Sequence, residues 1–248
     1  MDNIILSKLK KIEREYNVRI LWAIESGSRA WGFASQDSDY DVRCMHIGKK
    51  QDYLGLFPPP KQINLMEDNI DIESWDIKKF SELTLKSNPQ IAEWLRSDIV
   101  YIDSPIKGEF RKIFDKGCSL DYLKYHYLRM ARQNYHRYMG AELAPSCKKY
   151  LYVLRTLACA KFIEKEDKLP PLPYEKVIPY LPNNIQKFFR RCVIEKNSTE
   201  NAKIVSDKIT LEFIESNVKK DIPKKEFGFK ETASLNKYLV NIISSQND

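Results

Sequence analysis

The sequence has few of the features that mark membrane-inserted, secreted or zinc-binding proteins. No apolar run in the 248 residues approaches the roughly 18 residues that a membrane-spanning helix requires. The first residues contain no basic stretch followed by a long apolar one, so we expect no signal peptide. The five cysteines include no Cys-x-x-Cys pair, and the three histidines are scattered. This spacing argues against a disulfide framework and a zinc site, and it favours reduced thiols in the cytoplasm.

The composition is that of an ordinary folded protein with a basic surface. Apolar residues make up 43% of the chain and charged residues 30%, and the formal net charge is +7. A basic protein attracts polyanions, so a nucleotide or a nucleic acid is a plausible partner. The lysines are spread along the chain rather than gathered in one run, and a merely solvated lysine-rich surface explains the charge equally well.

Hydrophobic patterning predicts strands in the first half of the chain and helices in the second. The expected strands are 18–24, 41–47, 62–66 and 70–74, with a hairpin turn at 67–69. The expected helices are 3–16, 76–87, 89–96, 105–116, 119–142, 145–166, 183–195, 199–219 and 231–244. We therefore predict an α+β fold. A small mixed sheet with flanking helices occupies residues 1–116, and an all-helical domain, 117–248, closes a cleft in which ligands bind.

The most informative stretch is residues 26–43, in which a glycine turn precedes two aspartates. Gly27 and Ser28 follow an apolar run, and Asp39 and Asp41 come eleven and thirteen residues after Ser28. Side chains alternate along a strand, so the two aspartates point the same way. Paired carboxylates repel each other unless a cation lies between them, and Mg²⁺ or Mn²⁺ is the usual cation. The turn should begin a short helix whose backbone N–H groups hold a phosphate. These are the two halves of a nucleotidyl-transfer site.

Two other interpretations of the aspartates are weaker. Asp39 and Asp41 could lie in a solvated surface turn, but the alternation that continues into Val42 and Arg43 favours a strand. A calcium loop would need a glycine and a closing glutamate that this segment lacks.

A neighbouring predicted strand carries two candidates for a third carboxylate, which the family resemblance described below implies. Asp71 and Glu73 share one face of the predicted strand 70–74, while the isoleucines share the other. We favour Asp71, because it lies between two β-branched apolar residues, and Glu73 is the alternative. Asp76 is better explained as the N-cap of the helix that follows.

Other residues could contact a bound nucleotide. Ser28 can donate its hydroxyl and backbone N–H to a phosphate, and Arg29 could pair with the triphosphate or remain on the surface. Lys148, Tyr152 and Arg155 share one face of a predicted helix. That face could hold the triphosphate or the acceptor, or it could simply be solvated. Tyrosines and arginines interleave over 122–138, which suggests either a nucleic-acid surface or, more simply, aromatic packing between helices.

The motifs resemble those of the DNA polymerase β superfamily of nucleotidyltransferases, in which Gly-Ser precedes Asp-x-Asp by about ten residues. Further blocks at 75–79, 86–89, 93–95, 100–101 and 148–155 resemble the RNA-repair-pathway, polymerase-β-like branch of that superfamily. The resemblance runs from about residue 20 to residue 171. It implies an enzyme that moves an NMP from an NTP to an acceptor hydroxyl, with two Mg²⁺ ions on Asp39, Asp41 and Asp71. An RNA 3′ end is one candidate acceptor.

Two other functions stay open at this point. One is a protein-modifying, AMPylating-type transferase of a toxin–antitoxin pair. The other is a non-catalytic nucleotide-binding regulator on the same scaffold, although a binding module has no need of paired metal carboxylates. The sequence leaves the nucleobase, the acceptor, the pathway and the oligomeric state open.

Overall fold

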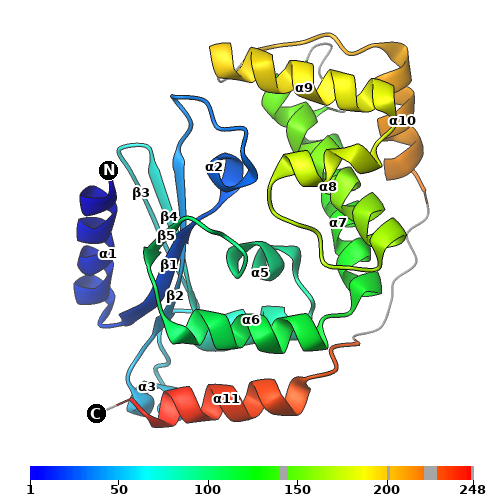
Figure 1. The fold of residues 1–248 in the computed structure, drawn as a ribbon. Helices are drawn as coiled ribbons and strands as arrows, with labels where there is room; N and C mark the ends of the chain where they lie inside the picture. Colours follow the sequence, from blue (N-terminus) through cyan, green and yellow to red (C-terminus); the bar gives the residue numbers. More distant parts are fainter. Residues whose placement is uncertain (140–144, 200–201, 221–227, 247–248) are drawn as a thin grey trace. The chain divides into compact units, whose positions relative to one another are not determined.

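The computed structural model describes residues 1–139, 145–199, 202–220 and 228–246. The chain forms two compact units (Figure 1). The first, here called the sheet unit, consists of Met1–Ala30, Asp39–Ser119 and Phe227–Asp248. The second, here called the helical unit, consists of Trp31–Ser38 and Leu120–Glu226. In the described part of the chain, no helix combines the length and the apolar character needed to cross a membrane.

A mixed five-stranded sheet organises the sheet unit, with the strands in the order β3-β4-β2-β1-β5. β2 and β4 are parallel, and every other neighbouring pair is antiparallel. The tight turn between β3 and β4 places Asp68 and Asn69 at φ of 51° and 59°, which these two residue types tolerate well. The strands are β1 (Arg19–Glu25), β2 (Tyr40–Ile47), β3 (Gln62–Glu67), β4 (Ile70–Asp76) and β5 (Val100–Ile102).

One face of the sheet is covered by α1 (Asp2–Tyr16). Ile5, Leu9 and Ile12 recur at helical spacing on the buried side of α1. They form one apolar cluster with residues of the strands, including Val42 of β2 and Ile72 of β4. The predicted helix 3–16 is therefore confirmed, and it accounts for the apolar face of β2 and β4.

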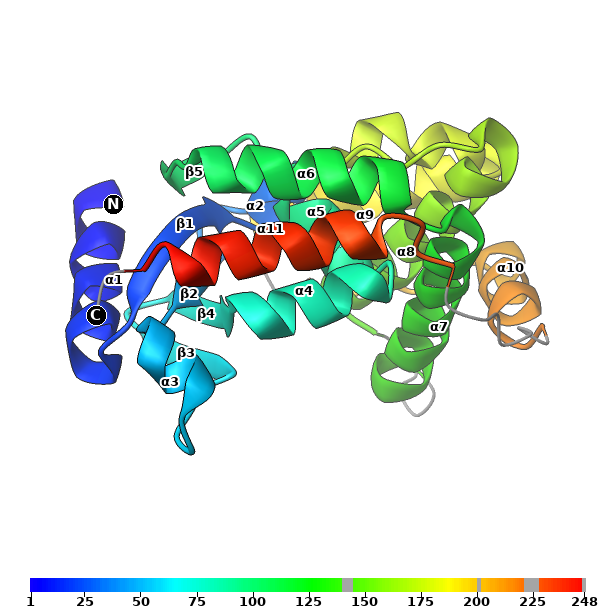
Figure 2. The same cartoon turned by 90° about the horizontal axis from the view of Figure 1, so that it is seen from below.

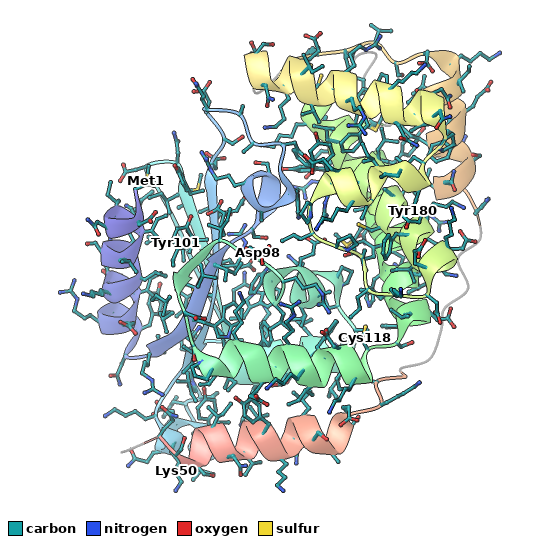
Figure 3. All side chains as sticks on the ribbon, viewed as in Figure 1. Met1, Lys50, Asp98, Tyr101, Cys118 and Tyr180 are labelled. Atoms are coloured by element: carbon teal, nitrogen blue, oxygen red, sulfur yellow. The ribbon has the colours of Figure 1, made fainter. Side chains whose placement is uncertain are left out.

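The opposite face of the sheet carries an aromatic core beneath α4 (Ile77–Leu85), α5 (Pro89–Trp94) and α6 (Pro105–Gly117). Trp75 and Trp94 stack with their ring centroids 3.9 Å apart, and Phe80 lies edge-on to Trp22 at 5.4 Å. Side chains fill the space between the sheet and α6 (Figure 3). Asp76 accepts a 2.8 Å hydrogen bond from the backbone N–H of Lys78, which confirms its predicted role as an N-cap.

The last helix, α11 (Thr232–Ser244), belongs to the sheet unit and not to the helical one. It packs against α4 and α6, and Figure 2 shows it running beside both. Leu235 is buried, and the ring of Tyr238 lies 5.4 Å from that of Phe110. The predicted assignment of all residues after 116 to one helical domain is therefore corrected for this helix, whose apolar face completes the sheet unit.

The helical unit is built from four α-helices and two short 3₁₀ helices within its described residues. α8 is the central element and contacts each of the other α-helices of the unit. The elements are α7 (Leu120–Tyr138), α8 (Cys147–Glu166), α9 (Asn183–Ser198), α10 (Lys208–Val218), η1 (Tyr174–Lys176) and η2 (Ile178–Tyr180).

The segment Trp31–Ser38 enters this helical unit from the middle of the sheet unit's sequence. The ring of Phe33 is buried against Tyr174 and Phe189, with centroids 5.9 Å and 6.3 Å away. The ammonium group of Lys196, which is fully buried, lies 2.9 Å from the Ser38 hydroxyl. The chain between the glycine turn and the first aspartate is therefore held by the helical unit.

One predicted helix begins later than expected, and two short elements were not predicted. The helix expected over 199–219 begins only at Lys208, because the preceding residues run alongside the start of α8: Ala202 accepts a hydrogen bond from Cys147, and Lys203 bridges to Ser146. The helix α3 (Lys50–Leu54) and strand β5 were not predicted, since neither is long enough to show a clear period. Residues 140–142 and 200–201 of the predicted helices lie outside the described residues.

Replacing Phe80 by alanine tests the aromatic core. Phe80 is fully buried and contacts four aromatic rings, so Phe80→Ala should lower the free energy of unfolding by about 3–5 kcal/mol. Phe57, which is 87% exposed, is the matched control, and Phe57→Ala should change the free energy of unfolding by less than about 0.5 kcal/mol. Urea denaturation of both variants measures the difference, and similar values for the two would contradict the packing described here.

Candidate active site

The glycine turn is in direct contact with the Asp41 carboxylate. β1 ends at Glu25, and Gly27 adopts a φ of +58° as α2 (Gly27–Trp31) begins. A Cβ atom on Gly27 would lie 1.8 Å from Oδ2 of Asp41. The backbone N–H of Ser26 also donates to the Asp41 carbonyl at 2.8 Å. Only glycine permits both this backbone conformation and this approach, so the turn and the carboxylate form one site.

The parallel pairing of β2 and β4 places Asp71 level with Asp41. In this register Asp41 is opposite Asp71, and Arg43 is opposite Glu73. Because side chains alternate along each strand, all four lie on one face of the sheet. This is the face that carries Trp75, whereas Val42 and Ile72 point toward α1. The register thus answers the question of which carboxylate on β4 is level with Asp41.

The guanidinium of Arg43 lies between these two carboxylates. Its Nη2 atom is 2.9 Å from Oδ1 of Asp41 and 2.8 Å from Oδ2 of Asp71. Its Nη1 atom donates to the backbone carbonyls of Val42 at 3.1 Å and Asp71 at 2.8 Å. Contact of Arg43 with these two carboxylates was not predicted, although its position two residues after Asp41 placed it on the same strand face.

Glu73 is held by other groups. Its Oε1 atom accepts hydrogen bonds from the Trp75 indole at 2.8 Å and from the Gln62 amide at 2.7 Å. Oε2 lies 3.7 Å from Nε of Arg43. The carboxylate therefore connects β4 to β3 and to the aromatic core, whereas Asp71 is level with Asp41.

Asp39 precedes β2 and is half-buried. Its backbone carbonyl accepts a 3.3 Å hydrogen bond from Nε of Arg29, and the Arg29 guanidinium lies 3.9 Å from the centre of the Tyr40 ring. Arg29 thus connects α2 to the start of β2. Ser28 is buried in the same turn.

Glu25 supports the site from beneath the turn. Its fully buried side chain accepts hydrogen bonds from the Asp41 backbone N–H at 2.9 Å and from the Tyr101 hydroxyl at 2.6 Å. Burial raises the pKa of the Glu25 carboxyl, while these two hydrogen bonds act in the opposite direction. Tyr101, labelled in Figure 3, is a contributor that sequence analysis missed, because β5 was not predicted.

The three predicted nucleotide contacts on α8 lie in the helical unit. The Tyr152 ring is edge-on to Trp31, with the centroids 5.6 Å apart, and the guanidinium of Arg155 lies 4.2 Å from the centre of the Trp31 ring. Arg155 is buried, whereas Lys148 and Tyr152 are half-buried. Tyr152 and Arg155 therefore hold the first residue of the segment 31–38. On α7, Tyr122 and Tyr127 are buried as packing residues.

The donor set at Asp41 and Asp71 fits a divalent cation. Both carboxylates already point at one positively charged atom, Nη2 of Arg43, which stands where a shared cation would be held. Oxygen ligands of this type suit Mg²⁺ or Mn²⁺. Within the described ranges, no three His, Cys, Asp or Glu side chains converge closely enough to hold a metal ion. Asp39 would thus complete the set only with a rearrangement of this site.

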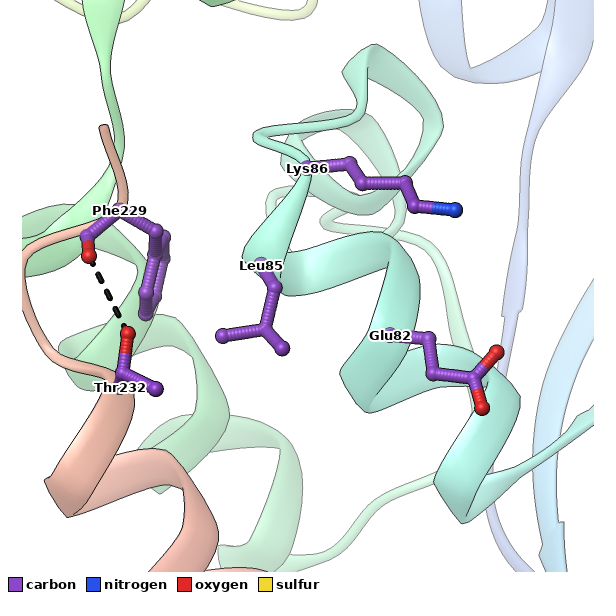
Figure 4. A pocket seen from close by; sticks show the side chains of 5 residues that line it. All are labelled: Glu82, Leu85, Lys86, Phe229 and Thr232. Atoms are coloured by element: carbon purple, nitrogen blue, oxygen red, sulfur yellow. Dashed lines mark hydrogen bonds between the residues drawn. The ribbon is translucent and has the colours of Figure 1, made fainter. Parts of the chain in front are cut away.

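Two hollows beside α11 lie in a different region of the sheet unit. One, of about 410 Å³, lies between α4 and the segment entering α11 and is lined by Glu82, Leu85, Lys86, Phe229 and Thr232 (Figure 4). None of these residues belongs to the glycine turn or to the carboxylate face.

A glycine turn in contact with a strand carboxylate, and a second carboxylate level with it on the next strand, define a domain of the nucleotidyltransferase type. Comparison with protein families agrees: the model of the RNA repair pathway DNA polymerase beta family matches residues 1–241. The chain therefore belongs to this family.

Two individual proteins are also similar. A protein of Bacillus subtilis (strain 168), described as the uncharacterized protein YcgL, is 42% identical over 177 residues, which cover 70% of this chain and 67% of that protein. A solved nucleotidyltransferase-like protein from Exiguobacterium sibiricum 255-15 aligns with 98% of this chain and 81% of its own, at 10% identity and a TM-score of 0.33.

Substituting Gly27 tests the contact between the turn and Asp41. Gly27→Ala should lower the free energy of unfolding by about 2 kcal/mol or more, through the positive φ and the clash with the carboxylate. Gly108, within α6, has open space at its Cβ position and is the control. Gly108→Ala should raise the stability by about 0.5–1 kcal/mol. Thermal or urea unfolding distinguishes the two, and a neutral Gly27→Ala variant would contradict the described geometry.

Proposed function

We propose that the protein is a divalent-metal-dependent nucleotidyltransferase that transfers an NMP from an NTP to an acceptor hydroxyl. The observation that carries the proposal is the contact between the Asp41 carboxylate and Gly27, with Asp71 level with Asp41 on the neighbouring strand. Phosphate binding and cation binding are then adjacent, as nucleotidyl transfer requires. Family membership supports the same reaction class.

Each residue has a distinct part in the proposed reaction. Gly27 and Ser28 hold the triphosphate at the start of α2, and Arg29 orients the segment that carries Asp39. Asp39, Asp41 and Asp71 would hold two Mg²⁺ or Mn²⁺ ions, which when bound neutralise charge on the triphosphate and on the departing pyrophosphate. Lys148, Tyr152 and Arg155 are proposed to contact the nucleotide or the acceptor, and the last two also hold Trp31.

The proposed chemistry is an in-line displacement at the α-phosphorus. The acceptor oxygen forms the new bond to phosphorus, the bond to the bridging oxygen breaks, and pyrophosphate leaves with that electron pair. The hydroxyl proton passes to Asp71, whose side chain is 38% exposed and so can be reached by an acceptor. Positioning and charge neutralisation supply most of the acceleration. An RNA end is the proposed acceptor, because the family is described by an RNA repair pathway.

Incubation with labelled NTPs and Mg²⁺ tests this function. RNA with a free 3′ hydroxyl, a protein mixture and no acceptor are compared in parallel, and label should be transferred to RNA. Asp39→Asn and Asp41→Asn should each abolish transfer while the thermal unfolding transition is retained. Near-normal transfer by both variants would overturn the metal assignment, and label found only on protein would favour the protein-modifying alternative.

A matched pair of variants tests the third carboxylate. Asp71→Asn should lower the transfer rate at least about a hundredfold, because it removes a proton acceptor and a negative charge from the site. Glu73→Gln should cost less than about tenfold, since its amide can keep a hydrogen bond from Trp75 or Gln62. Single-turnover rates under saturating NTP measure both. The opposite order would move the assignment to Glu73.

A further inference from the structure

Arg43 makes two kinds of contact with the candidate metal site, one from each end of its guanidinium. Nη2 bonds only carboxylate oxygens, those of Asp41 and Asp71. Nη1 bonds only backbone carbonyls, those of Val42 and Asp71. The carbonyl contacts belong to the sheet and do not depend on the charge state of the site. They keep Arg43 in place whether or not its carboxylate contacts are made.

In the metal-free protein, Arg43 reduces the repulsion between the carboxylates of Asp41 and Asp71. Asp41 and Asp71 are directly opposite each other on adjacent strands, about 4.8 Å apart in backbone spacing, and like charges placed this way destabilise a sheet. The Arg43 side chain is only 13% exposed, so its attraction to both carboxylates is screened less than that of a surface pair. Arg43 therefore neutralises the pair when no metal is present.

We propose that Arg43 is an internal counter-ion that competes with the divalent cation for Asp41 and Asp71, and thereby sets the affinity of the site for metal. This inference rests on the proposed function, because it assumes that these carboxylates bind the cation. Metal binding breaks the Nη2 contacts, while the Nη1 contacts keep the guanidinium beside the site. Arg43 acts through the carboxylates and is thus a positioning residue.

If Arg43 competes with the cation, replacing it should change the stability and the metal affinity of the protein in opposite directions. Removing the guanidinium should lower the free energy of unfolding of the metal-free protein and raise its affinity for the cation. Without Arg43, the repulsion between the two carboxylates is relieved only when the cation binds. A purely structural arginine would weaken the protein equally with and without metal. An arginine that contacts only the triphosphate would alter NTP binding and leave the metal affinity unchanged.

Mn²⁺ binding measured by electron paramagnetic resonance, without nucleotide, tests the inference directly. Arg43→Gln should bind Mn²⁺ about tenfold more tightly than the natural protein, and Arg43→Lys, which keeps the charge, should lie between them. Arg96 is the matched control in the same unit, with a 12% exposed side chain, an ion pair with Asp115 and a hydrogen bond to the Ala92 carbonyl. Arg96→Gln should leave Mn²⁺ affinity unchanged.

Unfolding experiments separate failure of this inference from failure of the proposed function. Arg43→Gln should lower the melting temperature in EDTA, and saturating Mn²⁺ should restore most of the loss, whereas Arg96→Gln should lose the same amount in both conditions. Asp41→Asn should weaken Mn²⁺ binding in either background. If the natural protein binds Mn²⁺ through Asp41 but Arg43→Gln does not tighten it, the counter-ion role is overturned and the proposed function stands. If no variant binds Mn²⁺, both are overturned.

Discussion

The parallel pairing of β2 with β4 is the constraint on which the candidate site depends. It sets Asp41 opposite Asp71 and Arg43 opposite Glu73, and a shift of one residue would send Asp71 to the face that is buried against α1. The apolar alternation of the two strands holds the register, because Val42 and Ile72 must remain in the core. The packing of α1 therefore stabilises the arrangement of charges on the other side of the sheet.

The site concentrates negative charge and compensates for it locally. Asp41 is bonded through its backbone N–H to Glu25, through its carbonyl to Ser26, and through its carboxylate to Arg43. Such a network keeps the carboxylate in place against Gly27, where a side chain of any size would displace it. These bonds fix the backbone and the carboxylate of Asp41 before a charged ligand enters.

The two halves of the candidate site are joined by a segment that belongs to the other unit. The chain leaves the glycine turn at Trp31, is anchored in the helical unit by Phe33 and by the Ser38–Lys196 contact, and returns at Asp39. The spacer between Gly-Ser and Asp-x-Asp is therefore long enough to include Phe33, which anchors it in the helical unit. Packing of Tyr152 and Arg155 on Trp31 belongs to the same anchorage.

The sequence by itself determined the strands β1 to β4, most helices and the glycine turn, because each depends on local periodicity or on residues close in the chain. Tertiary structure decided that Asp71 is level with Asp41, that Arg43 lies between them, and that Tyr101 supports Glu25. The contacts of Arg43 with Asp71 and of Tyr101 with Glu25 join residues 28 and 76 positions apart, so they follow from strand register. Tertiary structure also decided the place of α11. The sequence of this helix does not show which unit its apolar face packs against, and the structure places that face beside α4 and α6.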